Sequence, residues 1–253
     1  MRRLGQPDYR RLGLGGPPWG LGPLSLKYAR KVLSVERASL ISDLPLWEQA
    51  GSVARDFTGN GRNGASVGVT LGEPGIGDGR TSYGFDGAND YVNWYSAGLA
   101  AAFNGAEGTL GPMWFKMPAA AWTDGLVRAS NIGADGTNYV RLQKAAANGT
   151  VAFIYSAGTI QSRTKSGLST TDWFSMTITW KKSDDEVKPY WNGVQEGATL
   201  NGLGIWAGAP AATRCVIGAA LTTPTFPFLG NIQHVPLRNK ALTPAQVAYL
   251  SKP

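Results

Sequence analysis

The segment WFSMTITW, at residues 173–180, restricts the fold of this chain more than any other feature of its sequence. Large apolar residues alternate in it with serine and threonine, so the two kinds of side chain point to opposite sides of an extended strand. A strand with one apolar face and one polar, more exposed face is typical of an antiparallel sheet. The alternation therefore predicts a strand whose buried face carries Phe174, Met176, Ile178 and Trp180.

Two Asn-Gly pairs extend this prediction along the chain. Asn192-Gly193 separates EVKPYW from VQEGATL, and Asn148-Gly149 separates TNYVRLQKAAA from TVAFIYSAG. A type I′ turn needs positive φ at both central residues, which Asn and Gly adopt most readily, so each pair predicts a β-hairpin. Pro189 cannot donate a hydrogen bond to a neighbouring strand, so its strand should have an edge or a bulge there.

The composition also favours short strands and tight turns. Of the 253 residues, 34 are Gly, 9 are Trp and 9 are Tyr, while only 16% are charged, which suits a β domain better than a helical one. The single cysteine, Cys215, cannot form an internal disulfide, and we expect it in the core. The lack of disulfides favours folding in a reducing cytoplasm. No stretch is long and apolar enough for a membrane span.

Residues 1–41 differ from the rest of the chain and are predicted to form a basic arm. Residues 1–25 contain six Gly and four Pro, a composition that cannot form a regular helix or a core of its own. These residues also interrupt any apolar stretch, so the segment does not resemble a secretory signal. In residues 26–41 the spacing of Leu26, Ala29, Leu33 and Arg37 fits a short helix, although the β-branched content also fits a strand.

Most of the net charge of +7 lies near this arm. Residues 1–45 contain eight Lys or Arg and three Asp or Glu, whereas residues 46–253 contain sixteen and fourteen. So little apolar surface cannot offset the chain entropy lost on folding back, about 1–2 kcal/mol per residue. We therefore expect residues 1 to about 30 to leave the domain and dock on another subunit, through Arg2, Arg3, Tyr9, Arg10, Arg11 and Trp19. Nucleic acid is not an expected partner, because the sequence has no recognition helix and no aromatic-interleaved basic patch.

The chain ends on a predicted helix. Thr243 and Gln246 have the spacing of a capping box, in which the Thr hydroxyl accepts from the Gln N–H and the Gln side chain reaches back to the Thr N–H. Pro244, at the first helical position, loses no hydrogen bond there. These residues predict a short C-terminal helix.

Three segments carry a further pattern: ISDLPLWEQAGSVARDFTGNGRNG at 41–64, SYGFDGANDYVNW at 82–94 and FLGNIQHVPLRNKALTPAQVAYL at 228–250. Together they resemble the laminin-G-like, concanavalin A-like lectin superfamily, whose Asp-x-Ser/Thr-Gly-Asn-Gly-x-Asn-Gly loop fits residues 56–64. The resemblance implies an all-β, jelly-roll sandwich of two antiparallel sheets over residues 42–253, with a short C-terminal helix. The composition of residues 1–41 adds an extended N-terminal arm to this domain.

Catalysis is not expected, although the same fold hosts glycoside hydrolases. Those enzymes place a nucleophile and a general acid on one face of a Glu-x-Asp-x-Glu strand. None of the six Glu residues begins such a motif, and the acidic run at 184–186 is explained as a solvated turn. The lone His234 and the absence of a Gly-x-Ser-x-Gly motif leave no metal triad and no activated serine. We therefore predict no enzyme activity and no cofactor.

Calcium is the next candidate ligand, because related domains bind it between the opening Asp loop and an acidic pair in a Gly-x-Ile-Asp-Glu context. Residues 230–234 read Gly-Asn-Ile-Gln-His, so both carboxylates are replaced. Asp56 and backbone carbonyls alone make a poor cage for an ion that takes about six to eight oxygens. Asp86 and Asp90 could act as ligands, but a turn with Asx hydrogen bonds is the simpler interpretation. No metal is expected.

Sugar binding stays open. Lectin sites stack aromatic faces on sugar rings and add a few polar groups that fix orientation. The aromatic residues beside loop-like sequence, and so the candidates for glycan contact, are Trp94, Tyr95, Trp122 and Trp206.

Two functions from different classes fit these observations. The first is a structural or decoration protein of a virion, in particular of a bacteriophage. It would be made in the host cytoplasm, anchored by its arm to other virion proteins, and would display the sandwich for glycan adhesion. The second is a cell-surface or secreted carbohydrate-binding module. The fold suits both, while the arm and the missing export signal and disulfides favour the first.

Overall fold

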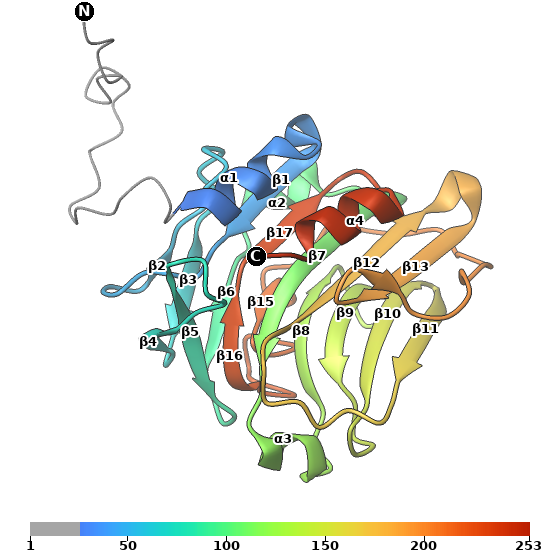
Figure 1. The fold of residues 1–253 in the computed structure, drawn as a ribbon. Coiled ribbons are helices and arrows are strands. Elements are labelled where there is room, and N and C mark those ends of the chain that lie inside the picture. Colours follow the sequence, from blue (N-terminus) through green and yellow to red (C-terminus); the bar gives the residue numbers. More distant parts are fainter. Residues whose placement is uncertain (1–25) are drawn as a thin grey trace, which may run out of the picture.

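The computed structural model describes residues 26–253, which form two antiparallel sheets packed face to face (Figure 1). The predicted all-β sandwich is therefore confirmed. Within these residues sheet A has nine strands; β17 (Val235–Arg238) pairs with both β7 and β1 (Leu40–Leu44). The other strands follow one another as β14 (Val194–Gln195), β13 (Glu186–Trp191), β12 (Phe174–Lys181), β7 (Glu107–Lys116), β16 (Leu229–Gln233), β5 (Thr81–Asp86) and β4 (Thr70–Pro74).

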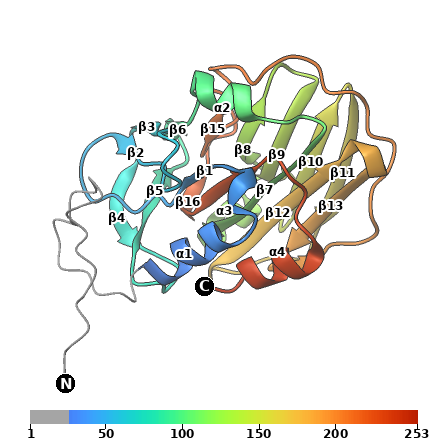
Figure 2. The same ribbon diagram turned by 90° about the horizontal axis from the view of Figure 1, so that it is seen from above.

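Sheet B forms the second layer. Its strands, in spatial order, are β11 (Thr159–Lys165), β10 (Val151–Ala157), β9 (Asn138–Lys144), β8 (Arg128–Gly133), β15 (Val216–Ile217), β6 (Tyr91–Asn93), β3 (Gly64–Val67) and β2 (Val53–Ala54). The α-helices are short: α1 (Lys27–Ser34), α2 (Ala97–Ala102), α3 (Ala119–Thr123) and α4 (Pro244–Leu250). Figure 2 looks down on the end of the sandwich where α1, α2 and α4 lie. No helix within residues 26–253 is long and apolar enough to cross a membrane.

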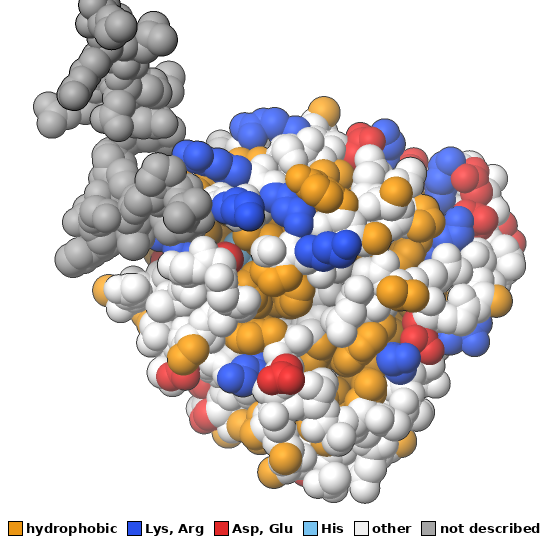
Figure 3. Space-filling view, viewed as in Figure 1, with side chains coloured by type: hydrophobic (Ala, Val, Ile, Leu, Met, Phe, Trp, Pro, Cys, Tyr) orange, Lys and Arg blue, Asp and Glu red, His pale blue; other side chains and the backbone are white. Residues whose placement is uncertain are grey.

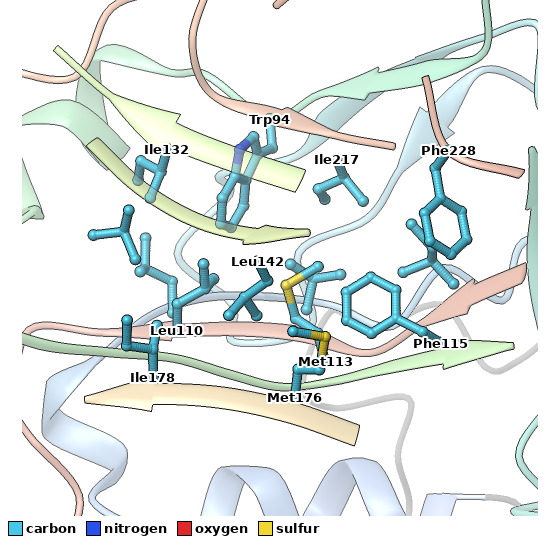
Figure 4. Close-up of a cluster of buried hydrophobic side chains, with 14 of the residues drawn as sticks. Trp94, Leu110, Met113, Phe115, Ile132, Leu142, Met176, Ile178, Ile217 and Phe228 are labelled. Carbon is cyan, nitrogen blue, oxygen red and sulfur yellow. The ribbon is translucent and has the colours of Figure 1, made fainter. Parts of the chain in front are cut away.

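The main core lies between the two sheets and contains the predicted face of β12. Phe174, Met176, Ile178 and Trp180 are each at most 2% exposed and belong to the central hydrophobic cluster. Figure 4 shows Met176 and Ile178 among the other side chains of this cluster. Phe174 stacks between Phe115 of β7 and Trp191 of β13, with ring centroids 5.8 and 4.5 Å apart. The alternation in residues 173–180 thus identified the inward face correctly.

The opposite face of β12 is also buried, which corrects the expectation of a more exposed polar side. Ser175, Thr177 and Thr179 are at most 3% exposed. A second hydrophobic cluster covers much of this outer face of sheet A, because α1 and α4 pack on it; its buried members are Tyr28, Val32, Leu40, Trp114, Tyr190, Leu242, Val247 and Leu250. The alternation of residues within β12 gives no indication that helices from other parts of the chain pack on its outer face.

Helix α1 is part of the sandwich, whereas the domain boundary was expected at residue 42. Residues Lys27–Ser34 are helical, which decides between the helix and the strand left open by the sequence. The Tyr28 hydroxyl donates to the Leu250 carbonyl (2.7 Å) and accepts from the Trp114 indole N–H (2.8 Å). The arm prediction required residues 1 to about 30 to leave the domain. For residues 26–30 this prediction is wrong, because they belong to the packed domain. Residues 1–25, with all six predicted docking residues, lie outside the described part of the chain.

The helix cap and one of the two Asn-Gly turns have the predicted geometry, whereas the other turn differs. The capping box of Thr243 and Gln246 is formed as predicted at the start of α4. Asn192 and Gly193 both have positive φ (48° and 80°), as a type I′ turn requires. At the other pair only Gly149 has positive φ, and the loop is longer, with the Ala145 N–H donating to the Thr150 carbonyl (2.8 Å). The predicted hairpin exists there, but the predicted turn type is wrong.

Candidate ligand-binding surface

A groove of about 360 Å³ crosses the outer face of sheet A beside the region that α1 and α4 cover. Its lining follows one row of cross-strand partners, in which Thr70 pairs with Gly84, Gly84 with Asn231, and Asn231 with Lys116. Directly paired residues of an antiparallel sheet point to the same face. The register of four strands therefore brings a hydroxyl, an amide and an amine together, and we call this site the outer-face groove.

Gly84 forms part of the groove because it has no side chain. A Cβ added to it would lie 3.1 Å from Glu73 Cγ, 3.4 Å from Thr70 Cβ and 3.7 Å from the Asn231 amide nitrogen. These side chains thus lean over the position that a larger residue would occupy. The Asn231 amide nitrogen is 3.5 Å from the Ser82 hydroxyl, at the outer limit for a hydrogen bond, so it can donate to a ligand. The lining also includes the side chains of Glu73 and Asp86.

Apolar surface adjoins this polar row. Trp173 and Ile76 are half-buried and pack against the cluster beneath α1 and α4. Trp173 precedes Phe174, which pairs with Phe115, so continuation of the register places Trp173 opposite Lys116. Figure 3 shows hydrophobic side chains gathered in a hollow over the middle of this face, below a row of basic ones. Aromatic and apolar surface beside a few polar groups is the usual composition of a sugar site.

The four aromatic residues predicted from the sequence do not form this site. Trp94 and Trp122 are 1% and 2% exposed, so neither ring face is open to a sugar and both predictions are wrong. Trp206 is half-buried on Phe103 and Tyr155, and its indole N–H donates to the Gly208 carbonyl (3.0 Å). Tyr95 is half-buried against the main core. Trp94 and Tyr95 are neighbours in the segment after β6, whereas Trp122 lies in α3 and Trp206 in the long segment between β14 and β15.

The loop at residues 56–64 is held in place by hydrogen bonds from its side chains to backbone groups of the loop and of β1. The Asp56 carboxylate accepts hydrogen bonds from the Asp43, Thr58 and Arg62 N–H groups (3.0–3.1 Å) and from the Thr58 hydroxyl (2.8 Å). The Asn60 amide donates to the Leu40 and Ile41 carbonyls (3.2 and 3.0 Å). The loop is thereby tied to β1 by groups that a bound ion would otherwise use.

Asp86 and Asp90 form the expected turn. Asp86 Oδ1 accepts from the Ala88 N–H (2.8 Å), and Asp90 Oδ2 accepts from the Asp86 N–H (2.9 Å). Residues 26–253 contain no group of three or more His, Cys, Asp or Glu side chains arranged to hold a metal ion. The acidic run is a turn too, in which Asp184 pairs with Lys181 (2.6 Å) and Asp185 accepts from the Gly202 and Leu203 N–H groups (2.8 Å).

A buried polar cluster takes the place of the acidic pair found in calcium-binding relatives. His234 Nε2 lies 3.0 Å from Asp78 Oδ2, and the Tyr28 ring packs on the imidazole at 4.5 Å between centroids. Gln233 accepts from the Ile76 N–H (2.7 Å). Asp43 is fully buried nearby, and desolvation raises its pKa to about 6, although the charges of His234 and Arg238 oppose the shift. This cluster lies under α1 and is closed to ligands.

Sequence comparison identifies the family. A family model described as the concanavalin A-like lectin/glucanases superfamily matches residues 86–248, more than half of the chain. The chain belongs to this superfamily. A search of curated protein sequences finds no match.

Solved structures share the fold at low sequence identity. The binding domain of paraclostridial mosquitocidal protein 1 aligns with a TM-score of 0.63 and 16% identity, over 85% of this chain and 52% of that one. Domain 4 of AbnA, an extracellular arabinanase from Geobacillus stearothermophilus in complex with arabinotriose, gives 0.59 and 20%, over 85% and 98%. Trypanosoma rangeli sialidase in complex with sialic acid gives 0.60 and 16%, over 85% and 33%. The chain spans about half the length of the first structures it matches.

Proposed function

We propose that this chain is a non-enzymatic, carbohydrate-binding β-sandwich and that its glycan lies in the outer-face groove. The observation that carries the proposal is the row of Thr70, Asn231 and Lys116 beside Gly84 in the lining of the groove. Trp173 is not one of the lining residues, and continuation of the strand register places it opposite Lys116. Hydroxyl, amide and amine groups match the hydrogen-bonding edge of a sugar, and the indole supplies an apolar face. The superfamily and the carbohydrate complexes among the similar structures support the same ligand class.

The distribution of carboxyl groups supports a binding role over catalysis. A glycosidase needs a general acid whose raised pKa keeps it protonated beside the substrate. Burial raises the pKa of two carboxyl groups, Asp43 and Asp90. Both are at most 4% exposed, and neither lines the outer-face groove. Two carboxyl groups, those of Glu73 and Asp86, do line the groove, but they come from different strands, and the Asp86 carboxylate accepts a hydrogen bond from the Ala88 N–H.

Paired substitutions test the glycan site. Asn231→Ala removes an amide that is worth about one hydrogen bond, so the affinity for an array-identified glycan should fall roughly tenfold. Lys116→Ala should act in the same direction. Asn148→Ala and Lys27→Ala, which change exposed residues outside the groove, are matched controls. Equal binding by all four variants, with unchanged melting temperatures, would reject the groove.

The finer proposal is that a virion, in particular a bacteriophage particle, carries this sandwich. The basic, Gly- and Pro-rich composition of residues 1–25 supports it, together with the fixing of α1 by Tyr28 and by Arg238, whose guanidinium donates to the Val32 carbonyl (2.8 Å). An anchor segment needs such a firm attachment to the domain it holds. The competing view is a cell-surface or secreted lectin, for which no anchoring partner is required.

Deletion of residues 2–25 separates these two views. If the arm is an anchor, the truncated protein folds, keeps its glycan affinity and no longer joins the particle, as shown by co-sedimentation with assembled virions. Normal incorporation of the truncated protein, or purification of the full chain only as a free protein, would contradict the virion role.

A further inference from the structure

A second hollow, of about 560 Å³, lies at the end of the sandwich seen in Figure 2, between the end of α1, the start of β1, the Asp56 loop and α2. We propose that it binds a sugar unit that carries a carboxylate or a sulfate group. This site is separate from the outer-face groove, shares no lining residue with it and does not depend on it. We call it the arginine hollow.

Two guanidinium groups give the hollow its charge. Arg37 and Arg62 line it, and no Asp or Glu does. Arg62 is held in place by a hydrogen bond from its Nη1 to the Ile41 carbonyl, so its orientation is fixed before a ligand arrives. Arg37 is exposed and forms no ion pair or side-chain hydrogen bond with a residue of the described part of the chain. Guanidinium groups bind planar carboxylates and the oxygens of sulfate through paired hydrogen bonds.

The acidic residues nearby are already engaged and leave this charge uncompensated. Asp56 accepts from three backbone N–H groups and a hydroxyl. Glu36 pairs with Lys240 (2.9 Å) through one oxygen and accepts from the Gln246 amide (3.2 Å) through the other. An anionic ligand would therefore meet two cations and no free carboxylate.

The rest of the lining offers hydrogen-bonding groups that match the hydroxyl groups of a sugar. Polar side chains of Ser39, Thr58, Asn60 and Asn239 surround the two arginines, while Leu33 and Ala102 supply small apolar patches. No aromatic residue lines the hollow, so neither a nucleic-acid base nor a sugar ring would stack on an aromatic face there, and recognition rests on the two guanidinium groups and the polar side chains. The volume lies within the range of about 300–1,000 Å³ typical of small-ligand sites. Hydroxyl-rich rings with one acidic group match this combination.

The test compares charged and neutral sugars on the full chain. We titrate sialyllactose against lactose, and galactose 3-sulfate against galactose, by calorimetry. The proposal predicts that the charged member of each pair binds at least about tenfold more tightly, the gain expected from one charge-assisted hydrogen-bonded pair. Inorganic sulfate and acetate, titrated alone, should bind more weakly than the charged sugars. Equal binding of charged and neutral sugars, or of sulfate and the sulfated sugar, would overturn the proposal.

Four variants locate the site. Arg37→Ala should remove the preference for the charged sugar, while Arg30→Ala, which removes an exposed arginine of α1 outside the hollow, should leave it unchanged. Ala38→Trp places bulk at the exposed rim without changing charge and should also abolish binding. Equal losses in Arg37→Ala and Arg30→Ala would show a diffuse charge effect and reject the hollow. If Asn231→Ala no longer binds the charged sugar, that sugar lies in the outer-face groove and the arginine hollow is rejected. If the outer-face groove binds no glycan, the preference for charged sugars and its loss in Arg37→Ala are still expected.

Discussion

The outer face of sheet A is divided into a covered region, beneath α1 and α4, and an open region that contains the outer-face groove. The same strands build both. β7 carries Trp114, 5% exposed, in the covered region and Lys116, half-buried, two residues further on. β16 likewise carries Gln233, fully buried, and Asn231 in the groove. A step of two residues along one strand therefore separates a side chain that stabilises the fold from one available to a ligand.

The largest expected effect comes from uncovering the protected region. Tyr28→Ala removes a buried ring and the hydroxyl that joins α1 to Leu250 and Trp114, so the free energy of unfolding should fall by about 3–5 kcal/mol. Lys116→Ala, in the open region, should change it by less than about 0.5 kcal/mol. Urea unfolding of both variants measures the contrast. Similar values for the two would mean that α1 does not protect this face.

The covered region should also impose a pH dependence that the open region lacks. The folded-state pKa of Asp43, about 6, exceeds its ordinary value of 3.8, so its contribution to stability is complete below pH 4 and is lost as pH rises through 6. The expected loss is about 2–3 kcal/mol. Asp78 does not contribute to the loss between pH 4 and pH 6. Burial raises its pKa, but hydrogen bonds from His234, Gln233 and the Arg80 N–H hold the pKa below its ordinary value.

Asp43→Asn removes this titration and checks its origin. The stability of the wild type relative to Asp43→Asn should decline between pH 4 and pH 7, as followed by urea unfolding at each pH. A constant difference across that range would show that Asp43 does not change its protonation state on folding. In the variant Arg238 also loses the charge of Asp43, which changes the stability difference by a constant amount. The test therefore depends on how the difference in the free energy of unfolding changes with pH, and not on its absolute value.

The sequence predicts the features that depend on residues within one element, and it does not predict the features that depend on distant residues. The inward face of β12 and the capping box depend on residues within one element, and both are found as predicted. The cover over Ser175 depends on residues of α1 and α4, which lie far before and far after it in the sequence. The groove depends on the register of strands β4, β5, β16 and β7. The burial of Trp94 and Trp122 likewise depends on how distant parts of the chain pack around them. None of these long-range features leaves a local signal.

A smaller effect should come from the cap of α4. Thr243→Ala removes the hydroxyl that accepts from the Gln246 N–H, and the free energy of unfolding should fall by about 1 kcal/mol. Thr171→Ala, an exposed threonine that lines the groove, is the matched control and should have no measurable effect on stability. Hydrogen exchange of the α4 amides would detect the loosened cover directly. Unchanged exchange in Thr243→Ala would mean that the cap does not limit the opening of this helix.

Filling the floor of the groove tests the central claim most directly. Gly84→Val places a side chain in the groove, where its nearest neighbour is Glu73 Cγ, part of a flexible side chain that can move. We expect the free energy of unfolding to change by less than about 1 kcal/mol, while binding to the glycans identified on an array falls at least tenfold. A wild-type chain that binds no glycan, or a folded Gly84→Val variant that binds them as well as the wild type does, would contradict a glycan site in the outer-face groove.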